Sequence, residues 1–190
     1  MKKIVFIDNY DSFTYNLVHL VKKEINTPIK VFRNDEISVG DIDPYDIIII
    51  SPGPGLPCES GILLNLIDEY KKTKSIFGVC LGMQAIAEVF GATLYNLDKP
   101  LHGISTGIYH TGSKLFSGLP KTFEVGRYHS WAVEEAEIPS ELRITARDEK
   151  GIVLAIEHET YNIAGVQFHP ESILTQFGGD IMRNFLSGIK

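Results

Sequence analysis

The 190 residues suffice for one well-packed domain, and contents of 44% hydrophobic and 22% charged residues are those of an ordinary water-soluble globular protein. A net charge of −6 without a basic block argues against binding to nucleic acid, whose phosphates require a basic surface. Cys58 and Cys80 are too few for a disulfide framework, so we expect reduced thiols in a cytoplasmic protein. The first apolar run ends at Asp8, too early for a signal peptide, and no run is long enough to span a membrane.

The first half of the chain alternates between apolar strands and amphipathic helices. Strands are predicted at residues 3–7, 29–32 and 46–50, and directly before Cys80. A first helix is predicted from Phe13, with Asp11 or Ser12 as its N-cap, to the break at Pro28; further helices are expected over 62–70 and 83–90. Nearly continuous apolar strands that alternate with helices are typical of a parallel sheet covered on both faces.

Beyond Gly91 the pattern becomes β-rich. Short apolar runs that are punctuated by glycine and proline stand at 92–95, 104–110, 122–125, 142–146, 153–156 and 163–168. They either extend the first sheet or form a small second one. Phe177, Ile181 and Phe185 mark a C-terminal helix. The prediction is an α/β fold with a mostly parallel central sheet and a β-rich second half, in a single domain that covers 1–190.

The segment 75–90 is predicted to form a strand, a tight turn and a helix, with Cys80 at the bend. Gly78 and Gly82 stand two places to either side, as a sharp turn requires, because side chains packed close to the bend would collide. At a helix N-terminus, free N–H groups and the helix dipole stabilise a thiolate, which is the nucleophilic form of cysteine. The alternative is a buried structural cysteine, and the presence of a partner base decides between the two.

A candidate partner base follows the apolar run 163–168. His169 and Glu171 flank Pro170, and alternate residues of an extended chain share a face. The carboxylate could therefore hold the imidazole in one tautomer, as the third member of a nucleophile–base–acid set. A surface histidine beside a solvated glutamate is the alternative interpretation. Because both motifs are predicted at the C-terminal edge of a sheet, the pair together with Cys80 favours catalysis.

Residues 51–57, with the sequence SPGPGLP, are predicted to form a stiff loop directly after the strand 46–50. Its glycines allow the backbone to approach a ligand closely, and the amides of Gly53 and Leu81 are candidates for stabilising the oxyanion of a tetrahedral intermediate. The alternative is a rigid surface turn. Gln84, one helical turn beyond Cys80, either contacts the polar groups of a substrate or is an exposed helix residue.

Three motifs, SPGPGLP, GVCLGMQAI and GVQFHPES, resemble in order and spacing those of the class I (triad) glutamine amidotransferase family. The resemblance covers essentially the whole chain. Three further segments, DNYDSFT at 8–14, His102-Gly103 and RYHSW at 127–131, are similar to the glutaminase subunits of anthranilate synthase and aminodeoxychorismate synthase. The family implies a flavodoxin-like fold, hydrolysis of L-glutamine through a γ-glutamyl thioester, and ammonia that passes through a tunnel to a chorismate-using synthase subunit.

The resemblance also implies roles for individual residues. Cys80 is expected to be the nucleophile, His169 the general base and acid, and Glu171 the residue that orients His169. The backbone amides of Gly53 and Leu81 are the expected oxyanion donors. The residues expected to contact glutamine are Gly53, Pro54, Gly55, Leu81, Gln84, Ser130 and Trp131. No metal or cofactor is expected.

The sequence departs from the family pattern at two places. Met83 stands where relatives often have His or Gln, and HGIST at 102–106 replaces HGKTS in a loop that lies near the synthase in relatives. Neither departure touches the three expected catalytic residues. Cys58 matches no motif position and is interpreted as an incidental thiol.

Several functions remain compatible with these motifs. The glutaminase subunit of anthranilate synthase is favoured, but the aminodeoxychorismate synthase subunit shares every motif, and one chain can serve both partners. A free-standing thiol hydrolase acting on γ-glutamyl peptides would turn over without a partner. A non-catalytic binding module is the third class, against which the intact set of Cys80, His169 and Glu171 argues. Neither nucleic acid nor a membrane is expected among the partners.

Overall fold

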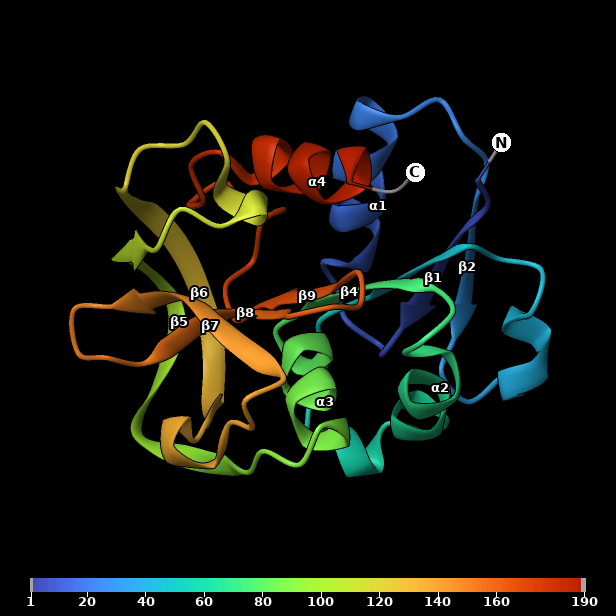
Figure 1. Ribbon diagram of the computed structural model, residues 1–190, viewed down its shortest axis with the longest axis horizontal. Coiled ribbons are helices and arrows are strands. Elements are labelled where there is room, and N and C mark those ends of the chain that lie inside the picture. The colour runs from blue at the N-terminus through green and yellow to red at the C-terminus, as the bar shows by residue number, and fades with distance from the viewer. Residues whose placement is uncertain (1, 189–190) are drawn as a thin grey trace.

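A computed structural model describes residues 2–188 of the chain, in which a single nine-stranded sheet runs through the molecule (Figure 1). The strand order is β2-β1-β3-β4-β9-β8-β7-β5-β6. The strands are β1 Ile4–Asp8, β2 Ile29–Arg33, β3 Ile47–Ile50, β4 Ser75–Val79, β5 Leu94–His110, β6 Thr122–Val133, β7 Leu142–Asp148, β8 Val153–His158 and β9 Ile163–Val166. The helices are α1 Thr14–Glu24, α2 Leu63–Tyr70, α3 Leu81–Val89 and α4 Gly178–Ser187.

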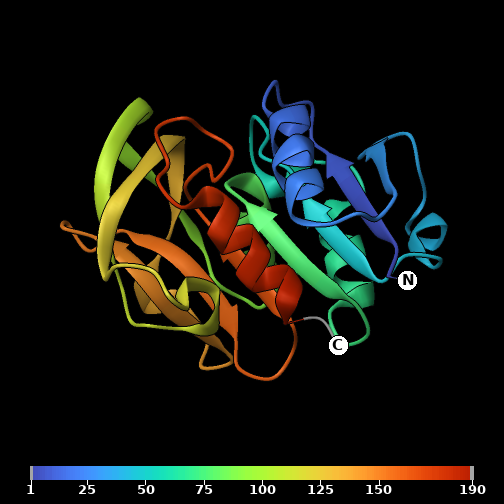
Figure 2. The same cartoon turned by 90° about the horizontal axis from the view of Figure 1, so that it is seen from above.

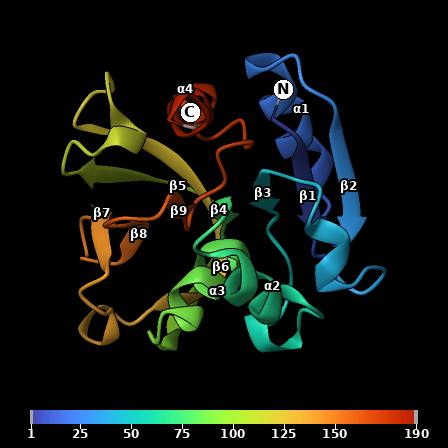
Figure 3. The same cartoon turned by 45° about the vertical axis from the view of Figure 1, so that its right-hand side comes forward.

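The strands from β2 to β9 in this order are parallel and lie between two layers of helices, as the sequence predicts. Helices α1 and α4 cover one face and α2 and α3 the other (Figures 1 and 3). Along β3, Ile47 and Ile49 pack into the cluster under α1 and α4, whereas Ile48 and Ile50 pack into the cluster under α2 and α3. Because every residue of such a strand faces a core, the strand is apolar throughout.

The β-rich second half extends this sheet by antiparallel pairing and does not form a second one. β8 pairs antiparallel with β9, β7 with β8, and β5 with both β7 and β6. The separate runs predicted at 92–95 and 104–110 belong to one long strand, β5, whose register against β6 shifts between Asn96 and Leu101 and again between His102 and Ile104. These irregularities carry the glycine and proline that interrupt the apolar pattern.

The predicted helix starts are wrong by one or two residues; α2 begins at Leu63 rather than at 62, and α3 at Leu81 rather than at 83. The N-cap of α1 is Phe13 rather than Asp11 or Ser12; the Asp11 carboxylate accepts a hydrogen bond from the Phe13 amide (2.7 Å) and thus forms a turn before the helix begins. Phe177, predicted to lie within the last helix, precedes α4 with a φ of 55°. Its ring packs edge-on against Phe123 of β6, so tertiary contact and not helical periodicity explains its apolar side chain.

α1 and α4 lie side by side above the parallel strands (Figure 2), joined by an ion pair between Glu24 and Arg183 (2.7 Å). In the part of the chain that the structure describes, no helix is long and apolar enough to cross a membrane. The loops that follow β1, β3, β4 and β9 all leave the carboxyl edge of the parallel strands, where ligands bind in open α/β sheets. The predicted functional motifs are therefore brought to one edge.

Candidate active site

Cys80 occupies a strained bend between β4 and α3. Its φ of 52° and ψ of −103° are unusual for a residue with a side chain, and its amide donates to the Val166 carbonyl of β9 (2.8 Å). A Cβ on Gly78 would collide with the Gly82 backbone, and one on Gly82 would lie 2.9 Å from Ile50. Both flanking glycines are thus required by close packing, as expected for a sharp turn from strand to helix.

His169 and Glu171 form a buried pair directly after β9. The ring atom Nδ1 of His169 lies 2.7 Å from Oε1 of Glu171, whose side chain has no solvent exposure. The backbone of His169 is fixed as well, because its amide donates to the Gly126 carbonyl (3.0 Å) and its own carbonyl accepts from the Thr175 hydroxyl. The orienting contact expected from the two-residue spacing is therefore formed.

His169 and Cys80 line one cavity of about 400 Å³, in which Nε2 of His169 is buried and has no hydrogen-bond partner among the described residues. Burial alone would lower the pKa of His169, but the nearby Cys80 sulfur and the hydrogen-bonded Glu171 carboxylate outweigh it and raise the pKa to about 10. Since Glu171 takes Nδ1, Nε2 is the ring atom left for the sulfur. The raised pKa keeps the imidazole protonated at neutral pH, so the histidine holds a proton that it can transfer.

An aromatic wall that the sequence analysis did not identify encloses this pair. The rings of Tyr128 and Phe13 pack edge-on against the His169 ring, at centroid distances of 4.8 and 5.9 Å, and His102 packs on Tyr128. Tyr128 also shares a hydrogen bond with Ser172 (3.1 Å). Its members lie in the three segments 8–14, 102–103 and 127–131 that the motifs mark, but only the fold shows that their rings meet at His169.

A second, smaller cavity of about 170 Å³ adjoins the first through Cys80. Six of the seven residues expected to contact glutamine line it, namely Gly53, Pro54, Gly55, Gln84, Ser130 and Trp131. The seventh, Leu81, is buried; its amide lies at the first turn of α3, and its side chain packs against Gly53. The structure thus gathers around the sulfur the residues that the motifs singled out, whereas Cys58 lies exposed on the single-turn helix Pro57–Glu59.

Asn9, just after the end of β1, fixes the loop that carries Gly53, a role that the motifs did not predict. Its backbone N–H donates to the Ser51 hydroxyl (2.9 Å), and its side chain donates to the Ser51 carbonyl (3.0 Å). Asn34 in turn donates to the Asn9 side chain (3.0 Å). A buried hydrogen-bond network thus holds the start of the SPGPGLP loop against the neighbouring strand. This anchor also limits the movement of the glycine-rich part that follows.

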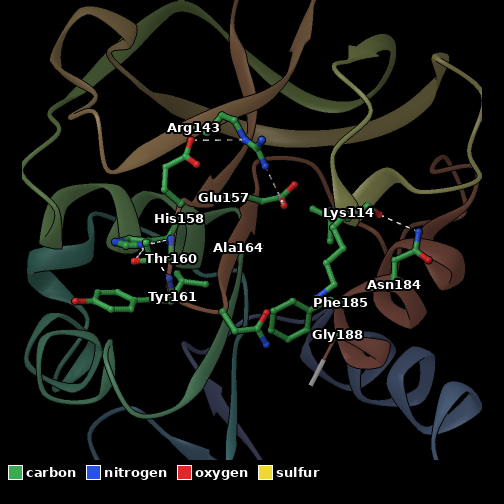
Figure 4. A pocket seen from close by; sticks show the side chains of 14 residues that line it. Lys114, Arg143, Glu157, His158, Thr160, Tyr161, Ala164, Asn184, Phe185 and Gly188 are labelled. Atoms are coloured by element: carbon green, nitrogen blue, oxygen red, sulfur yellow. Dashed lines mark hydrogen bonds and ion pairs between the residues drawn. The ribbon is translucent and has the colours of Figure 1, made fainter. Parts of the chain in front are cut away.

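Figure 4 shows another hollow, of about 350 Å³, at the opposite end of β9. Lys114, Arg143, Glu157 and His158 line it, and Arg143 lies 3.9 Å from the Glu157 carboxylate. It contains no cysteine. Within residues 2–188, no three His, Cys, Asp or Glu side chains are placed to share a metal ion. The cavities around Cys80 therefore remain the candidate active site.

Comparison with known proteins shows the family to which the chain belongs. The sequence model of the family described as glutamine amidotransferase class-I matches residues 5–189. The chain belongs to this family. Among its relatives is the aminodeoxychorismate/anthranilate synthase component 2 of Bacillus subtilis (strain 168), which is 44% identical over 185 residues, covering 96% of this chain and 95% of the relative.

Other members of the family differ in length. The bifunctional protein TrpGD of Thermotoga maritima is 43% identical over 190 residues, and this amidotransferase chain spans 32% of its length. A solved structure from Thermoplasma acidophilum, of a protein described as one component of a GMP synthase, superimposes with a TM-score of 0.87 at 29% identity and covers 98% of this chain and 93% of the other. The family resemblance and the α/β fold class expected from the motifs are thereby confirmed.

Proposed function

We propose that this amidotransferase is the glutaminase subunit of a chorismate-using synthase, with Cys80 as the nucleophile that hydrolyses L-glutamine. The observation that carries the proposal is the meeting of Cys80 with the His169–Glu171 pair in one cavity, although 89 positions of the sequence separate Cys80 from His169. Family membership supports it, since a family of glutamine amidotransferases requires a group that attacks the carboxamide.

In the first half of the reaction, the Cys80 thiolate attacks the side-chain carbonyl carbon of glutamine. A C–S bond forms, and the carbonyl electron pair moves to oxygen, where the amides of Gly53 and Leu81 are the proposed donors that stabilise it; one such donor contributes about 3–4 kcal/mol in known enzymes. Collapse of the intermediate breaks the C–N bond. The His169 imidazolium gives its proton to the departing nitrogen, which leaves as ammonia, and a γ-glutamyl thioester remains.

In the second half, water attacks the thioester and His169 takes its proton. The C–S bond then breaks, so that glutamate leaves and the thiolate–imidazolium pair returns. Throughout, Glu171 holds Nδ1 of the ring, which leaves Nε2 free to carry the proton. The balanced sum is glutamine plus water giving glutamate plus ammonia.

The partner that we propose is the synthase component that converts chorismate to anthranilate, with aminodeoxychorismate synthase as the second candidate. The relative from Bacillus subtilis carries both activities in its name, which supports either partner and a chain that serves both. Ammonia released into water would be lost to the synthase, so a bound partner is the physical expectation. The free thiols of Cys58 and Cys80 fit a cytoplasmic location.

The decisive experiment pairs this chain with the chorismate-using component I of such a relative. Cys80→Ser should abolish glutamine-dependent product formation, while the assembled complex still forms product from added ammonium. Loss of both activities would mean that Cys80 is structural. Labelling of Cys80 by a diazoketone analogue of glutamine, followed by mass spectrometry of the peptide, tests the nucleophile independently.

Comparison of the two products separates the candidate partners. Supplying each component I in turn and measuring anthranilate or aminodeoxychorismate shows which reaction the chain supports. Glutamine hydrolysis that is equally fast without any partner would contradict the proposed dependence on a synthase and favour a free-standing hydrolase. No labelling and no hydrolysis in any state would favour a binding module.

A further inference from the structure

A buried glutamine that the mechanism above does not use lies against the nucleophile. Gln167, directly after β9, has no solvent exposure, and its side-chain amide Nε2 lies 3.5 Å from Sγ of Cys80. It lines neither of the two cavities at the site. Its side chain therefore contacts the reacting atom from within the protein, on a side that substrate does not reach.

Gln167 stands at the end, next to Cys80, of a buried series of hydrogen bonds. Nε2 of Gln84 donates both to Oε1 of Gln167 (3.1 Å) and to the backbone carbonyl of Trp131 (2.9 Å). The same carbonyl lies 2.7 Å from Nδ1 of His129. Gln84 and His129 are only 3% and 6% exposed, so these bonds are largely shielded from bulk water.

The series of hydrogen bonds continues from His129 to a buried ion pair. Nε of Arg127 donates to Nε2 of His129 (3.0 Å), and Nη1 of Arg127 pairs with the Asp148 carboxylate, both side chains being almost completely buried. Burial, reinforced by the neighbouring Arg127 charge, lowers the pKa of His129 to about 4, so this imidazole is neutral at physiological pH. A neutral ring has one donor and one acceptor, which is what its two neighbours require.

The chemistry of the groups fixes the direction of every bond. Arginine only donates, so Nε2 of His129 accepts and its proton lies on Nδ1, from which it is donated to the Trp131 carbonyl. A carbonyl only accepts, so Gln84 turns its NH₂ group toward Trp131 and Gln167. Gln167 then uses its oxygen for Gln84 and has only its NH₂ group left for the sulfur.

We infer that Gln167 is a further catalytic residue, whose amide N–H stabilises the Cys80 thiolate. The series of hydrogen bonds that links Asp148 to Gln84 holds this N–H toward the sulfur. The inference rests on the proposed role of Cys80 as the nucleophile. His169 and Gln167 then act on the same atom in different ways. His169 gives up its proton during the reaction, whereas the amide of Gln167 keeps its hydrogen and lowers the cost of negative charge on sulfur throughout the cycle.

Alkylation of Cys80 tests the inference without any turnover. In a Cys58→Ser background only one thiol remains, and its rate of reaction with iodoacetamide is measured across pH. In Gln167→Met, which removes the donor at similar volume, the midpoint of the profile should move up by about one pH unit, and the rate near neutrality should fall about tenfold. Gln84→Met should move the midpoint in the same direction by a smaller amount.

A matched control and a double variant sharpen the test. Gln176→Met makes the same chemical change at an exposed position whose oxygen accepts only from the Glu124 amide, and it should leave the midpoint unchanged. The double variant Gln84→Met with Gln167→Met should behave like Gln167→Met alone, because the two act in series. The titratable groups around the sulfur are the same in all variants: Tyr10, Asp11, His102, Tyr128, His129, His169 and Glu171.

An unchanged midpoint in a folded Gln167→Met protein overturns the inference. Circular dichroism and thermal unfolding establish folding, and if Gln167→Met does not fold, the absence of a shift in Gln84→Met overturns the inference instead. In the assembled complex, Gln167→Met should lower kcat for glutamine about tenfold with KM within about twofold, since Gln167 does not line the binding cavities. A shifted midpoint in a chain that never hydrolyses glutamine would instead contradict only the proposed function.

Discussion

Cys80 has a backbone conformation that its side chain disfavours. A positive φ at a residue with a Cβ costs on the order of 1–3 kcal/mol, and here the surrounding strand and helix impose it. The same bend directs Sγ toward His169 and Gln167. The strain is thus a property of the position and not of the thiol, so it should remain in any variant that keeps a Cβ.

This reasoning predicts that glycine at position 80 stabilises the fold relative to alanine. Cys80→Gly should unfold with a free energy about 1 kcal/mol higher than Cys80→Ala, because glycine adopts positive φ without the steric penalty. Both variants should lack glutaminase activity. Urea unfolding of the two purified proteins measures the difference, and an alanine variant as stable as the glycine variant would show that the bend is unstrained.

The buried pair of His169 and Glu171 predicts a graded loss of activity. His169→Ala should lower kcat about 10³-fold, since it removes the group that carries the proton. Glu171→Gln keeps a hydrogen-bonding side chain in place and should lower kcat less, by about tenfold to a hundredfold. Glu159→Gln, an exposed change at a surface ion pair, is the matched control and should leave kcat within about twofold. The reverse order for the first two variants would refute the assigned roles.

At the scale of elements, the site depends on how closely the loop after β3 approaches the start of α3. A Cβ at Gly53 would lie 2.6 Å from the Asn9 Cβ and 2.7 Å from a methyl group of Leu81. At position 53 there is therefore room for the hydrogen atom of glycine but not for a methyl group. The proposed oxyanion donors, the amides of Gly53 and Leu81, belong to these two closely packed segments.

Gly53→Ala should consequently impair activity more than stability. Displacement of the loop by the new methyl group should lower kcat/KM for glutamine at least about tenfold, with a loss of about 1–3 kcal/mol in unfolding free energy. Gly40→Ala is a matched control, since nothing lies within 4 Å of the added Cβ, and it should leave both quantities nearly unchanged. Equal activity of the two variants would contradict the proposed placement of the oxyanion donors.

Local periodicity was sufficient to predict the parallel half of the fold. Runs such as 46–50 have almost no polar residue to face solvent, and the glycines at 78 and 82 mark a bend that only glycine allows. The length of β5 was not predictable, because its irregular middle part is held by pairing with β6 rather than by its own sequence. Whether the second half would extend the sheet depended on the pairing of β8 with β9, which no local pattern specifies.

The candidate site divides in the same way. Cys80 stands between two glycines that mark a bend, and His169 and Glu171 are two residues apart and so share a face. These local patterns allow the sequence to indicate all three residues. Gln167 adjoins one of these motifs, but its contacts with Cys80 and Gln84 join segments that are 87 and 83 positions apart. Residues of this kind, to which the aromatic wall also belongs, are recognised only when the fold brings their partners together.

At the scale of the whole molecule, one titration links the active site to stability. Cys80 and Glu171 stabilise the charged form of His169 and raise its pKa from the ordinary 6.5 to about 10. A group whose pKa rises on folding contributes stability that is complete below its unfolded pKa and is lost as pH increases through the folded value. The contribution of this group therefore falls between about pH 6.5 and pH 10.

We expect the free energy of unfolding to decrease over this range by at least about 1 kcal/mol through His169 alone. Urea unfolding at both ends of the range measures the total change, and the same measurement on His169→Asn, which does not titrate, isolates the contribution of the histidine. The decrease should be smaller in the variant. Identical pH dependence in the two proteins would show that the histidine is not charged in the folded state.

The adjacent strands β4 and β9 lead directly to Cys80 and to the segment that carries His169. Val79 and Val166, the last residues of the two strands, are paired with each other. Every strand from β5 to β8 is synthesised between them, so a chain still emerging from the ribosome has its thiol long before it has its base. The ability to hydrolyse glutamine should therefore arise late and in a single step, when β9 pairs with β4. A chain that lacks β9 should not consume glutamine, and the topology itself delays the reaction until β9 has been synthesised.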